Sequence, residues 1–242
     1  LFKSLRAMAS SEDSTTLARW RAVSSSSCCA NLLRIPTLTR IEARPKAPPH
    51  TRASHQLCYP AAVNLEALSV ETPRLVLRVP RATDFDAWAA MMTDQEAAKF
   101  IGGAAPREVT WRGMMTVIGA WYATGIGMFS VIEKASGKWV GRLGPWQPDG
   151  WPGTEIGWAI ARDYWGRGYA PEGAAAATDW AFDNLGWTKV IHSIHPENAA
   201  SQAVARKLGS RNLGPGKLPP PFQDARVDIW GQSREDWRAR RT

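Results

Sequence analysis

Apolar residues recur in two different rhythms over the last two thirds of the chain, and these rhythms predict strands mixed with helices. The segment Arg74-Leu75-Val76-Leu77-Arg78-Val79 follows a period of two, which is typical of a strand. Strands are predicted at residues 74–79, 127–133, 139–143, 154–160, 189–194 and 225–231. Helices are predicted at residues 83–92, 111–122, 171–185 and 198–208, with a short terminal helix from residue 233.

The ends of the predicted helices carry recognisable signals. Thr83-Asp84-Phe85-Asp86 has the form of a capping box, in which side chains satisfy the first backbone N–H groups of a helix. Pro171 stands in the first turn of its helix, and Gly209 follows the last turn of another, where these residue types are common. Residues 214–222 are rich in Pro and Gly and predict a long loop, a kind of segment that is often functional.

The composition changes near residue 68. Residues 1–68 hold nine Lys and Arg against four Asp and Glu, which leaves 21 against 18 in residues 69–242. The basic charge therefore belongs mainly to the N-terminal segment, and nucleic acid is not expected as a partner of the rest. The three cysteines, Cys28, Cys29 and Cys58, also lie in this segment. Neither a disulfide scaffold nor a catalytic thiol is expected in residues 69–242.

Residues 1–68 are expected to form a disordered, basic and serine-rich extension, and residues 69–242 a single folded domain. The extension contains Ser24-Ser25-Ser26-Ser27 and few spaced apolar residues, too few to offset the entropy lost on ordering. A transit peptide and a mispredicted upstream start are alternatives for this segment, since the chain begins with Leu1. No apolar stretch approaches the roughly 20 residues of a membrane span. We expect a cytoplasmic protein without a membrane partner.

The segment between residues 161 and 174 carries a chemical signal. It reads A-R-D-Y-W-G-R-G-Y-A-P-E-G-A, with Gly166 and Gly168 between a predicted strand and a helix. A glycine turn at a helix N-terminus directs backbone N–H groups outward, where they and the helix dipole favour an anion. Pro171 occupies the last glycine position of a dinucleotide-binding fingerprint, and the Gly-Lys-Ser/Thr of a P-loop is missing. The expected ligand of the loop is a pyrophosphate.

The residues Trp165-Gly166-Arg167-Gly168-Tyr169-Ala170 resemble the coenzyme A loop of the GNAT acetyltransferases, usually written Q/R-x-x-G-x-G/A. Trp165 departs from the usual Gln or Arg at the first position. The form W-G-x-G-Y-A is similar to the RimJ/RimL-like branch, which includes enzymes that act on ribosomal-protein N-termini. The order of predicted elements, β-α-α-β-β-β-α-β-α-β, is also similar to this family over about residues 70–240. The resemblance implies an α/β (α+β, mixed-sheet) GNAT fold with helices on both faces of a strongly twisted sheet.

The resemblance implies direct transfer of an acetyl group from acetyl-CoA to an amine in a ternary complex, without a covalent enzyme intermediate. Glu155 stands where RimJ/RimL-like relatives carry the candidate general base, which often acts through water. Burial raises the pKa of a glutamate toward neutrality and makes it a usable base. A solvent-facing or salt-bridged glutamate is the alternative. His192 and His195 alternate in a strand without the spacing of metal ligands, so no metal is expected.

The same resemblance implies the contacts to acetyl-CoA. In the family, the strand before the loop splays from its neighbour, pantetheine lies between them, and a backbone N–H near Trp158 polarises the thioester carbonyl. Asn198 corresponds to an asparagine that contacts pantetheine, and it also fits a helix N-cap. Ser201 fits the N-x-x-S of the RimL-like branch and is a candidate donor to the leaving sulfur, with core packing as the alternative. The expected acetyl-CoA-binding residues are Trp158, Ile160, Trp165, Gly166, Arg167, Gly168, Tyr169, Ala170, Asn198 and Ser201.

The acceptor side is less well marked. Trp146 and Trp151 precede the Glu155 strand and are expected to form an aromatic wall for the amine, with residues 214–222 covering it. The acceptor is expected to be a protein N-terminus or a small-molecule amine, and the protein a monomer or a homodimer. Ala205 replaces the tyrosine that many family members use as general acid. An acyl-CoA-binding sensor without catalysis is therefore the alternative function.

Overall fold

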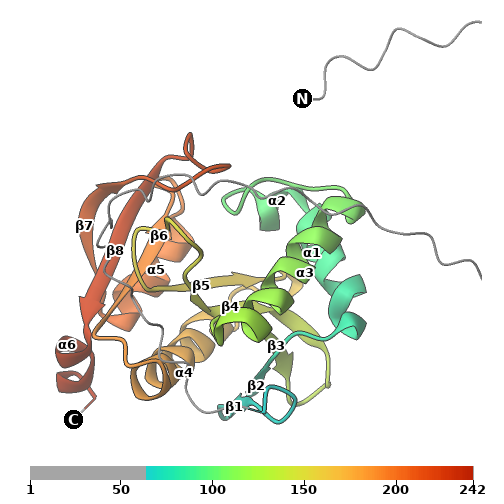
Figure 1. Ribbon diagram of the computed structural model, residues 1–242, viewed down its shortest axis with the longest axis horizontal. Coiled ribbons are helices and arrows are strands. Elements are labelled where there is room, and N and C mark those ends of the chain that lie inside the picture. Colours follow the sequence, from blue (N-terminus) through green and yellow to red (C-terminus); the bar gives the residue numbers. More distant parts are fainter. Residues whose placement is uncertain (1–63, 242) are drawn as a thin grey trace, which may run out of the picture. The chain divides into compact units, whose positions relative to one another are not determined.

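The computed structural model describes residues 64–241, which form an eight-stranded sheet with helices on both faces (Figure 1). The strands are β1 (Ser69–Glu71), β2 (Leu75–Arg78), β3 (Phe129–Glu133), β4 (Trp139–Trp146), β5 (Glu155–Ile160), β6 (Lys189–Ile194), β7 (Arg211–Gly216) and β8 (Val227–Ser233). The helices are α1 (Phe85–Thr93), α2 (Gln95–Ala98), α3 (Arg107–Thr124), α4 (Tyr169–Asn184), α5 (Ala199–Leu208) and α6 (Arg234–Ala239), with 3₁₀ turns at Ala82–Asp84 and Arg162–Tyr164. The predicted α/β fold with a mixed sheet is confirmed.

The strand order is β1-β2-β3-β4-β5-β6-β8-β7. Every neighbouring pair is antiparallel except β5 with β6, which run parallel. The parallel pair lies inside the sheet, and the chain crosses between its two strands through α4. Because the carboxyl end of β5 leads into this crossover, the predicted phosphate loop lies between β5 and the start of α4.

Two neighbouring residues of β4 show how the helices enclose the sheet. Leu143 points toward α4, where a Cβ on Gly173 would lie only 2.5 Å from the leucine Cδ2. Arg142 points the other way, with its guanidinium carbon 5.4 Å from the centre of the Trp88 ring of α1. Successive side chains of a strand point to opposite faces. Accordingly α4 covers one face together with α5, and α1 covers the other together with α3.

Three elements were not predicted, namely β1, α2 and β7. The first two have three and four residues, too few to show a period. The third includes Gly214, Pro215 and Gly216, so the prediction of a loop over residues 214–222 is wrong at its start. β7 is an edge strand that pairs with β8 on both sides of an irregularity between Asn212 and Pro215. An edge position tolerates proline because one side of the strand needs no backbone donor.

The predicted capping box at residues 83–86 is not formed, since α1 begins at Phe85 and Asp84 is buried. The Asp84 carboxylate instead accepts hydrogen bonds from Arg78 Nη2 at 2.6 Å, from Ser130 Oγ at 2.7 Å and from the Arg81 backbone at 2.9 Å. Burial raises the pKa of Asp84, but these bonds outweigh burial and hold it below its usual value. Asp84 therefore joins β2 to β3 and, through the Arg81 backbone, forms a capping box of the 3₁₀ turn that precedes α1.

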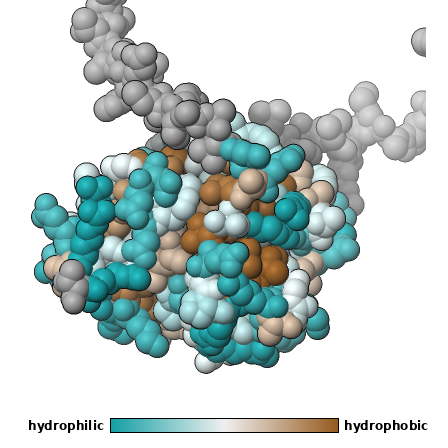
Figure 2. Space-filling model, turned by 90° about the horizontal axis from the view of Figure 1, so that it is seen from below, coloured by the Kyte–Doolittle hydropathy of each residue, from teal (hydrophilic) through white to brown (hydrophobic). Residues whose placement is uncertain are grey.

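The surface seen in Figure 2 is largely hydrophilic, with apolar side chains gathered near the middle of the view. Within residues 64–241, no helix is both long and apolar enough to cross a bilayer. Of the predicted extension, residues 1–63 lie outside the described residues. Leu65 and Leu68, near its end, pack against the core cluster that includes Leu75 and Leu77.

Candidate active site

The loop between β5 and α4 presents its backbone outward. Gly166 and Gly168 adopt the left-handed conformation, with φ of 75° and 78°, and Gly168 is the N-cap of α4. None of the backbone N–H groups of residues 166–170 has a hydrogen-bond acceptor within residues 64–241. Free N–H groups at a helix N-terminus attract negative charge, and glycine adopts the required φ without strain. The loop is therefore shaped to hold an anion such as a pyrophosphate.

The strands β5 and β6 separate immediately beyond Glu155. They pair only where Glu155 lies opposite Ile191. Just past this point the buried ring of His192 lies between them, with Nδ1 2.7 Å from the Ile156 carbonyl oxygen and Nε2 2.9 Å from Ser210 Oγ. Burial lowers the pKa of His192 to about 4, so its ring is neutral near pH 7. Within residues 64–241, the edge of β5 beyond the ring has no strand partner on the β6 side, so an extended amide chain can pair there.

A cavity of about 580 Å³ extends along this gap to the loop. Nine of the ten residues predicted to bind acetyl-CoA line it: Trp158, Ile160, Trp165, Gly166, Gly168, Tyr169, Ala170, Asn198 and Ser201. Arg167 lies instead at a neighbouring cavity. Among the lining residues that were not predicted, five come from the short helix α2 and the turn after it, which have no sequence signal: Glu96, Ala97, Lys99, Phe100 and Ile101.

Glu155 lies at the start of β5, where it is buried and 7% exposed. Its Oε2 accepts hydrogen bonds from the Trp151 indole N–H and from Ser193 Oγ, the latter at 2.8 Å. Its Oε1 receives only a long bond of 3.3 Å from the Ser193 backbone. A Cβ on Gly157 would lie 3.6 Å from this oxygen and only 2.8 Å from Met128 Cε, so Met128 packs over the glycine close to Oε1. One carboxylate oxygen is thus held, and the other can accept a proton.

Burial raises the pKa of Glu155, and the bonds from Trp151 and Ser193 offset only part of this effect. The expectation of a solvent-facing or salt-bridged glutamate does not fit, because no cation lies within ion-pair distance of this carboxylate in residues 64–241. A buried carboxyl with a raised pKa has the protonation behaviour that a general base requires.

The domain family described as Acetyltransferase (GNAT) domain matches residues 74–211, more than half of the chain. The chain belongs to the GNAT acetyltransferase family. The match extends from the start of β2 to the start of β7 and includes the glycine loop, Glu155 and Ser201. The protein is accordingly an acetyltransferase by family, which confirms the enzyme class predicted from the loop.

Individual relatives agree with this assignment. The chain is 28% identical over 146 residues to the uncharacterized N-acetyltransferase p20 of Bacillus licheniformis, which covers 59% of this chain and 82% of that protein. It is 37% identical over 87 residues to the uncharacterized protein YkkB of Bacillus subtilis, a match that spans 35% of this chain and only 51% of the relative. A solved acetyltransferase from Agrobacterium tumefaciens is 26% identical, with a TM-score of 0.61, and covers 73% of this chain and 100% of its own.

Two polar residues of this GNAT domain meet at the start of α5. Asn198 Oδ1 accepts the Ser201 backbone N–H at 3.0 Å, so Asn198 is the N-cap of the helix. Ser201 Oγ accepts a hydrogen bond from Trp158 Nε1 at 3.2 Å. The proton of the Ser201 hydroxyl has no hydrogen-bond acceptor within the described residues and remains free to be donated. Ala205, where many members of the family carry tyrosine, is fully buried against Ile194.

The tryptophans predicted for the acceptor side of the GNAT domain have different surroundings. Trp146 lies opposite Glu155 in the β4–β5 register and packs, partly buried, beside the cluster of α1 and α3. Trp151 donates its indole N–H to Glu155, and its ring stands edge-on to Phe222 with centroids 6.5 Å apart. Trp151 therefore has a task that the sequence did not indicate, namely to hold the candidate base in place.

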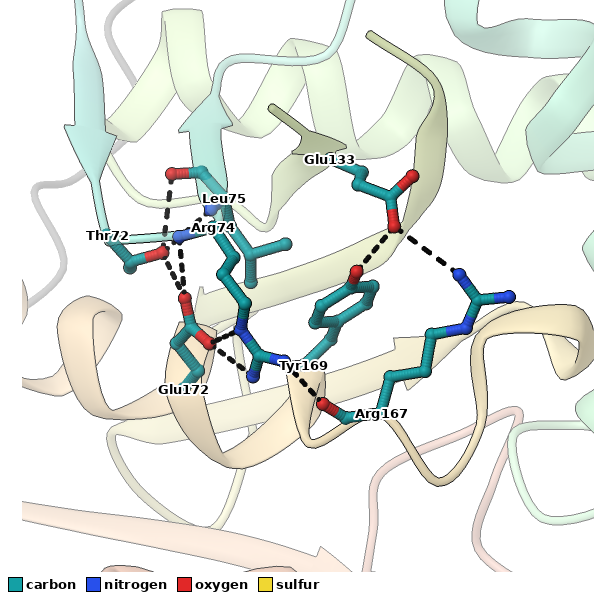
Figure 3. A network of polar contacts seen from close by, with 7 residues as sticks. All are labelled: Thr72, Arg74, Leu75, Glu133, Arg167, Tyr169 and Glu172. Atoms are coloured by element: carbon teal, nitrogen blue, oxygen red, sulfur yellow. Dashed lines mark hydrogen bonds and ion pairs between the residues drawn. The ribbon is translucent and has the colours of Figure 1, made fainter. Parts of the chain in front are cut away.

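The loop of the GNAT domain is held on one side by Glu172 of α4 (Figure 3). This carboxylate accepts hydrogen bonds from Thr72 Oγ1 at 2.6 Å, from Arg74 Nε at 2.6 Å and from the Arg74 backbone at 3.0 Å. Arg74 Nη1 in turn donates to the Arg167 carbonyl oxygen at 2.8 Å. Burial alone would raise the pKa of Glu172, but the hydrogen bonds from Thr72 and Arg74 lower it by more. The pKa of Glu172 is therefore below its usual value, and the carboxyl stays ionised. Arg74 thus joins the loop to the start of β2.

Glu133 of β3 holds the other side of the loop (Figure 3). It accepts a hydrogen bond from the Tyr169 hydroxyl and an ion-pair contact from Arg167 Nη1 at 3.5 Å. The Arg167 guanidinium also lies over the Tyr164 ring, 4.9 Å from its centre. In this structure the side chain predicted to reach a phosphate is therefore turned toward Glu133. Neither carboxylate was singled out from the sequence.

Proposed function

We propose that the protein transfers an acetyl group from acetyl-CoA to a primary amine, carried by a protein N-terminus or a small molecule, in a ternary complex. The observation that carries the proposal is the order of three features along β5: the anion-binding loop after its end, its unpaired edge, and the buried Glu155 at its start. A pyrophosphate, an amide-containing arm and a thioester follow one another in acetyl-CoA in the same order. No covalent enzyme intermediate is needed.

The residues of the cavity fit such a ligand. The free N–H groups of residues 166–170 bind the pyrophosphate, and the open edge of β5 pairs with the amides of pantetheine. The arm then lies between Trp158 on β5 and Asn198 at the start of α5. Acetyl-CoA supplies the acetyl group as an activated thioester. A backbone N–H near Trp158 is the group proposed to polarise the thioester carbonyl.

Glu155 is the proposed general base. It removes a proton from the acceptor amine through Oε1, directly or through one water, because Trp151 and Ser193 already occupy Oε2. Ser201 is the proposed donor to the leaving sulfur, since its hydroxyl proton is free while its oxygen accepts from Trp158. In this proposal Glu155 takes the proton of the amine, and Ser201 stabilises the leaving thiolate by a hydrogen bond without giving up its proton, in place of the tyrosine that Ala205 replaces.

The motif W-G-R-G-Y-A, with Asn198 and Ser201 spaced as N-x-x-S, supports placing the protein in the RimJ/RimL-like branch. This placement favours an acceptor amine at the end of a flexible peptide, with small-molecule amines as the other class. The aromatic rings of Trp146 and Trp151 are the proposed wall of the acceptor pocket, as their positions beside Glu155 suggest.

The deciding experiment compares the full-length chain with its Glu155→Gln variant. Binding of acetyl-CoA is measured by calorimetry, and thiol release is followed with a panel of N-terminal peptides and small amines. We expect unchanged binding and a loss of turnover of about 10²–10⁴-fold. Glu108→Gln, the same change at an exposed position of α3, is the control and should leave both quantities unchanged.

Two outcomes contradict the proposal. If the wild-type chain does not bind acetyl-CoA, the assignment of the cavity is wrong. If acetyl-CoA binds but no amine in the panel accelerates thiol release, in wild type or variant, the protein is an acyl-CoA-binding sensor instead.

A further inference from the structure

A second cavity, of about 620 Å³, lies on the far side of the phosphate loop. It is bounded by the loop, the first turns of α4, the end of α5 and the end of α6. The residues that it shares with the first cavity are Gly166, Gly168, Pro171 and Lys207, so the two cavities adjoin at the loop. Its lining is strongly basic, with five cationic residues and one acidic residue: Arg74, Arg167, Lys207, Arg240, Arg241 and Glu172.

Most of this charge is already neutralised inside the protein. Three ion pairs account for it: Arg74 with Glu172, Arg167 with Glu133, and Arg241 with Asp179. Lys207 and Arg240 have no carboxylate partner within residues 64–241. The guanidinium of Arg240 instead donates to the Lys207 carbonyl oxygen, at 3.4 Å. Two unneutralised cations thus face one cavity from α5 and from the end of α6.

The position of Arg240 depends on a glycine. Gly209 ends α5 with φ of 90°, and a Cβ placed on it would lie 1.3 Å from Arg240 Nη1. Only a residue without a side chain leaves room for the guanidinium beside Lys207. Like charges brought together without counter-ions repel, so their arrangement around a cavity favours binding of an anion.

We infer that Lys207 and Arg240 form a second anion site, which binds the phosphomonoester on the ribose of coenzyme A. The inference rests on the proposed function, because the ligand must already lie with its pyrophosphate in the loop. The ribose and its phosphate follow the pyrophosphate in the ligand, and this cavity follows the loop in the protein. A phosphomonoester carries a charge of about −1.5 to −2 near pH 7, which two cations match.

One of the two cations lies outside the segment that matches the GNAT domain. That segment ends at residue 211, whereas Arg240 lies directly after α6 (Arg234–Ala239). The position of this cation is therefore set by the C-terminal helix α6. Its orientation is set by Trp237, which is buried and donates its indole N–H to Asp179 Oδ1 at 2.7 Å.

The test is a comparison of coenzyme A with dephospho-coenzyme A, which differ only in the phosphomonoester. Both are titrated calorimetrically into the full-length wild-type chain and into Lys207→Ala and Arg240→Ala. We expect wild type to bind coenzyme A about tenfold more tightly, as expected for charge-assisted bonds to a phosphate. Each variant should lose most of this preference while its affinity for dephospho-coenzyme A stays unchanged. Raising the ionic strength should also reduce the preference.

Arg238→Ala is the matched control. It removes the same charge from α6, but Arg238 pairs with Asp183 at 3.0 Å and does not line the cavity. It should keep the full preference for coenzyme A. Unchanged affinity for dephospho-coenzyme A shows in each variant that the fold and the loop are intact.

Equal binding of both ligands by wild type would overturn this inference and leave the proposed function standing. An equal weakening of both ligands in the variants would also overturn it, because the residues would then act on the fold. Failure of wild type to bind either ligand would refute the proposed function, and this inference with it.

Discussion

The phosphate loop and the region around Glu155 are held together by different interactions. Around the loop, the Glu133 carboxylate accepts a hydrogen bond from Tyr169, and the Glu172 carboxylate accepts hydrogen bonds from the turn between β1 and β2. Around Glu155, loops distant in sequence meet mainly through rings, such as Trp151 against Phe222. Ion pairs with defined partners favour a single backbone arrangement, whereas contacts between partly exposed rings permit repacking.

A further contact between rings lies at the cavity, where Phe100 of the lining stacks on His195 with ring centroids 5.1 Å apart. Phe100 comes from the turn after α2, and His195 from the end of β6. If the proposed function holds, the end proposed to bind coenzyme A is fixed for one ligand, whereas the end proposed to meet the amine permits variation. Substitutions at the two ends should change different kinetic constants, and this separation is open to direct test.

The largest effect is expected from Gly168→Glu. The new side chain must adopt φ near 78°, and its carboxylate would stand among the N–H groups that are proposed to bind the pyrophosphate. Calorimetry should show acetyl-CoA affinity at least about 100-fold weaker, the sum of strain and charge repulsion. Gly186→Glu is the control, because Gly186 has φ of 65°, has no neighbour within 4 Å and lies outside the loop. Equal loss in both variants would show that strain alone is responsible.

A smaller effect is expected from Arg74→Gln, which removes the bond to the Arg167 carbonyl and the ion pair to Glu172. The loop loses its tie to β2, so the KM for acetyl-CoA should rise about tenfold, the size of one charge-assisted hydrogen bond. The kcat and the KM for the amine should not change. Arg74→Lys should restore part of the affinity. A variant that loses kcat instead would place Arg74 in the chemistry rather than in the support of the loop.

Trp151→Phe tests the acceptor end and should lower kcat by about three- to tenfold, the effect of one lost hydrogen bond to a catalytic group. Without the indole N–H, the carboxylate form of Glu155 is less stabilised, so the pKa of Glu155 rises further. Because the base must be deprotonated, the acid limb of the kcat profile should move to higher pH. The KM for acetyl-CoA should stay constant. An unshifted profile would show that Trp151 does not act through Glu155.

The smallest effect is expected from Phe222→Ala. The ring is 42% exposed and contacts Trp151 by its edge, so its removal should raise the KM for the amine by about two- to fivefold, as a single ring contact is worth about 1 kcal/mol. The size should depend on which amine is used, and acetyl-CoA kinetics should not respond. A change in acetyl-CoA binding would break the proposed separation of the two ends.

The sequence predicted the features that depend on neighbouring residues. Gly166 and Gly168 predicted the loop because a left-handed backbone conformation favours glycine. Gly209 predicted the end of α5 for the same reason. Asn198 was predicted as an N-cap and is one. The order of strands and helices was predicted from the spacing of apolar residues, because most of these elements are long enough to show a clear period.

Features that join distant segments had no such signal. Arg74 and Glu172 stand 98 positions apart, and nothing in either neighbourhood indicates the other. Trp151 was noticed as an aromatic ring and not as a donor to Glu155, since the side-chain direction depends on the fold of the preceding loop. Glu155 was proposed as the general base through resemblance, whereas its burial and its hydrogen bonds required the structure.

The ring of His192 has one more consequence. The His192 ring forms a hydrogen bond with the Ile156 carbonyl oxygen where β5 and β6 separate. The ring therefore keeps the two strands apart. The gap between β5 and β6 is therefore present before a ligand binds, and binding does not require the two strands to separate. Stopped-flow traces of coenzyme A association should show a single phase whose rate rises in proportion to ligand concentration, with no plateau from a slow opening step.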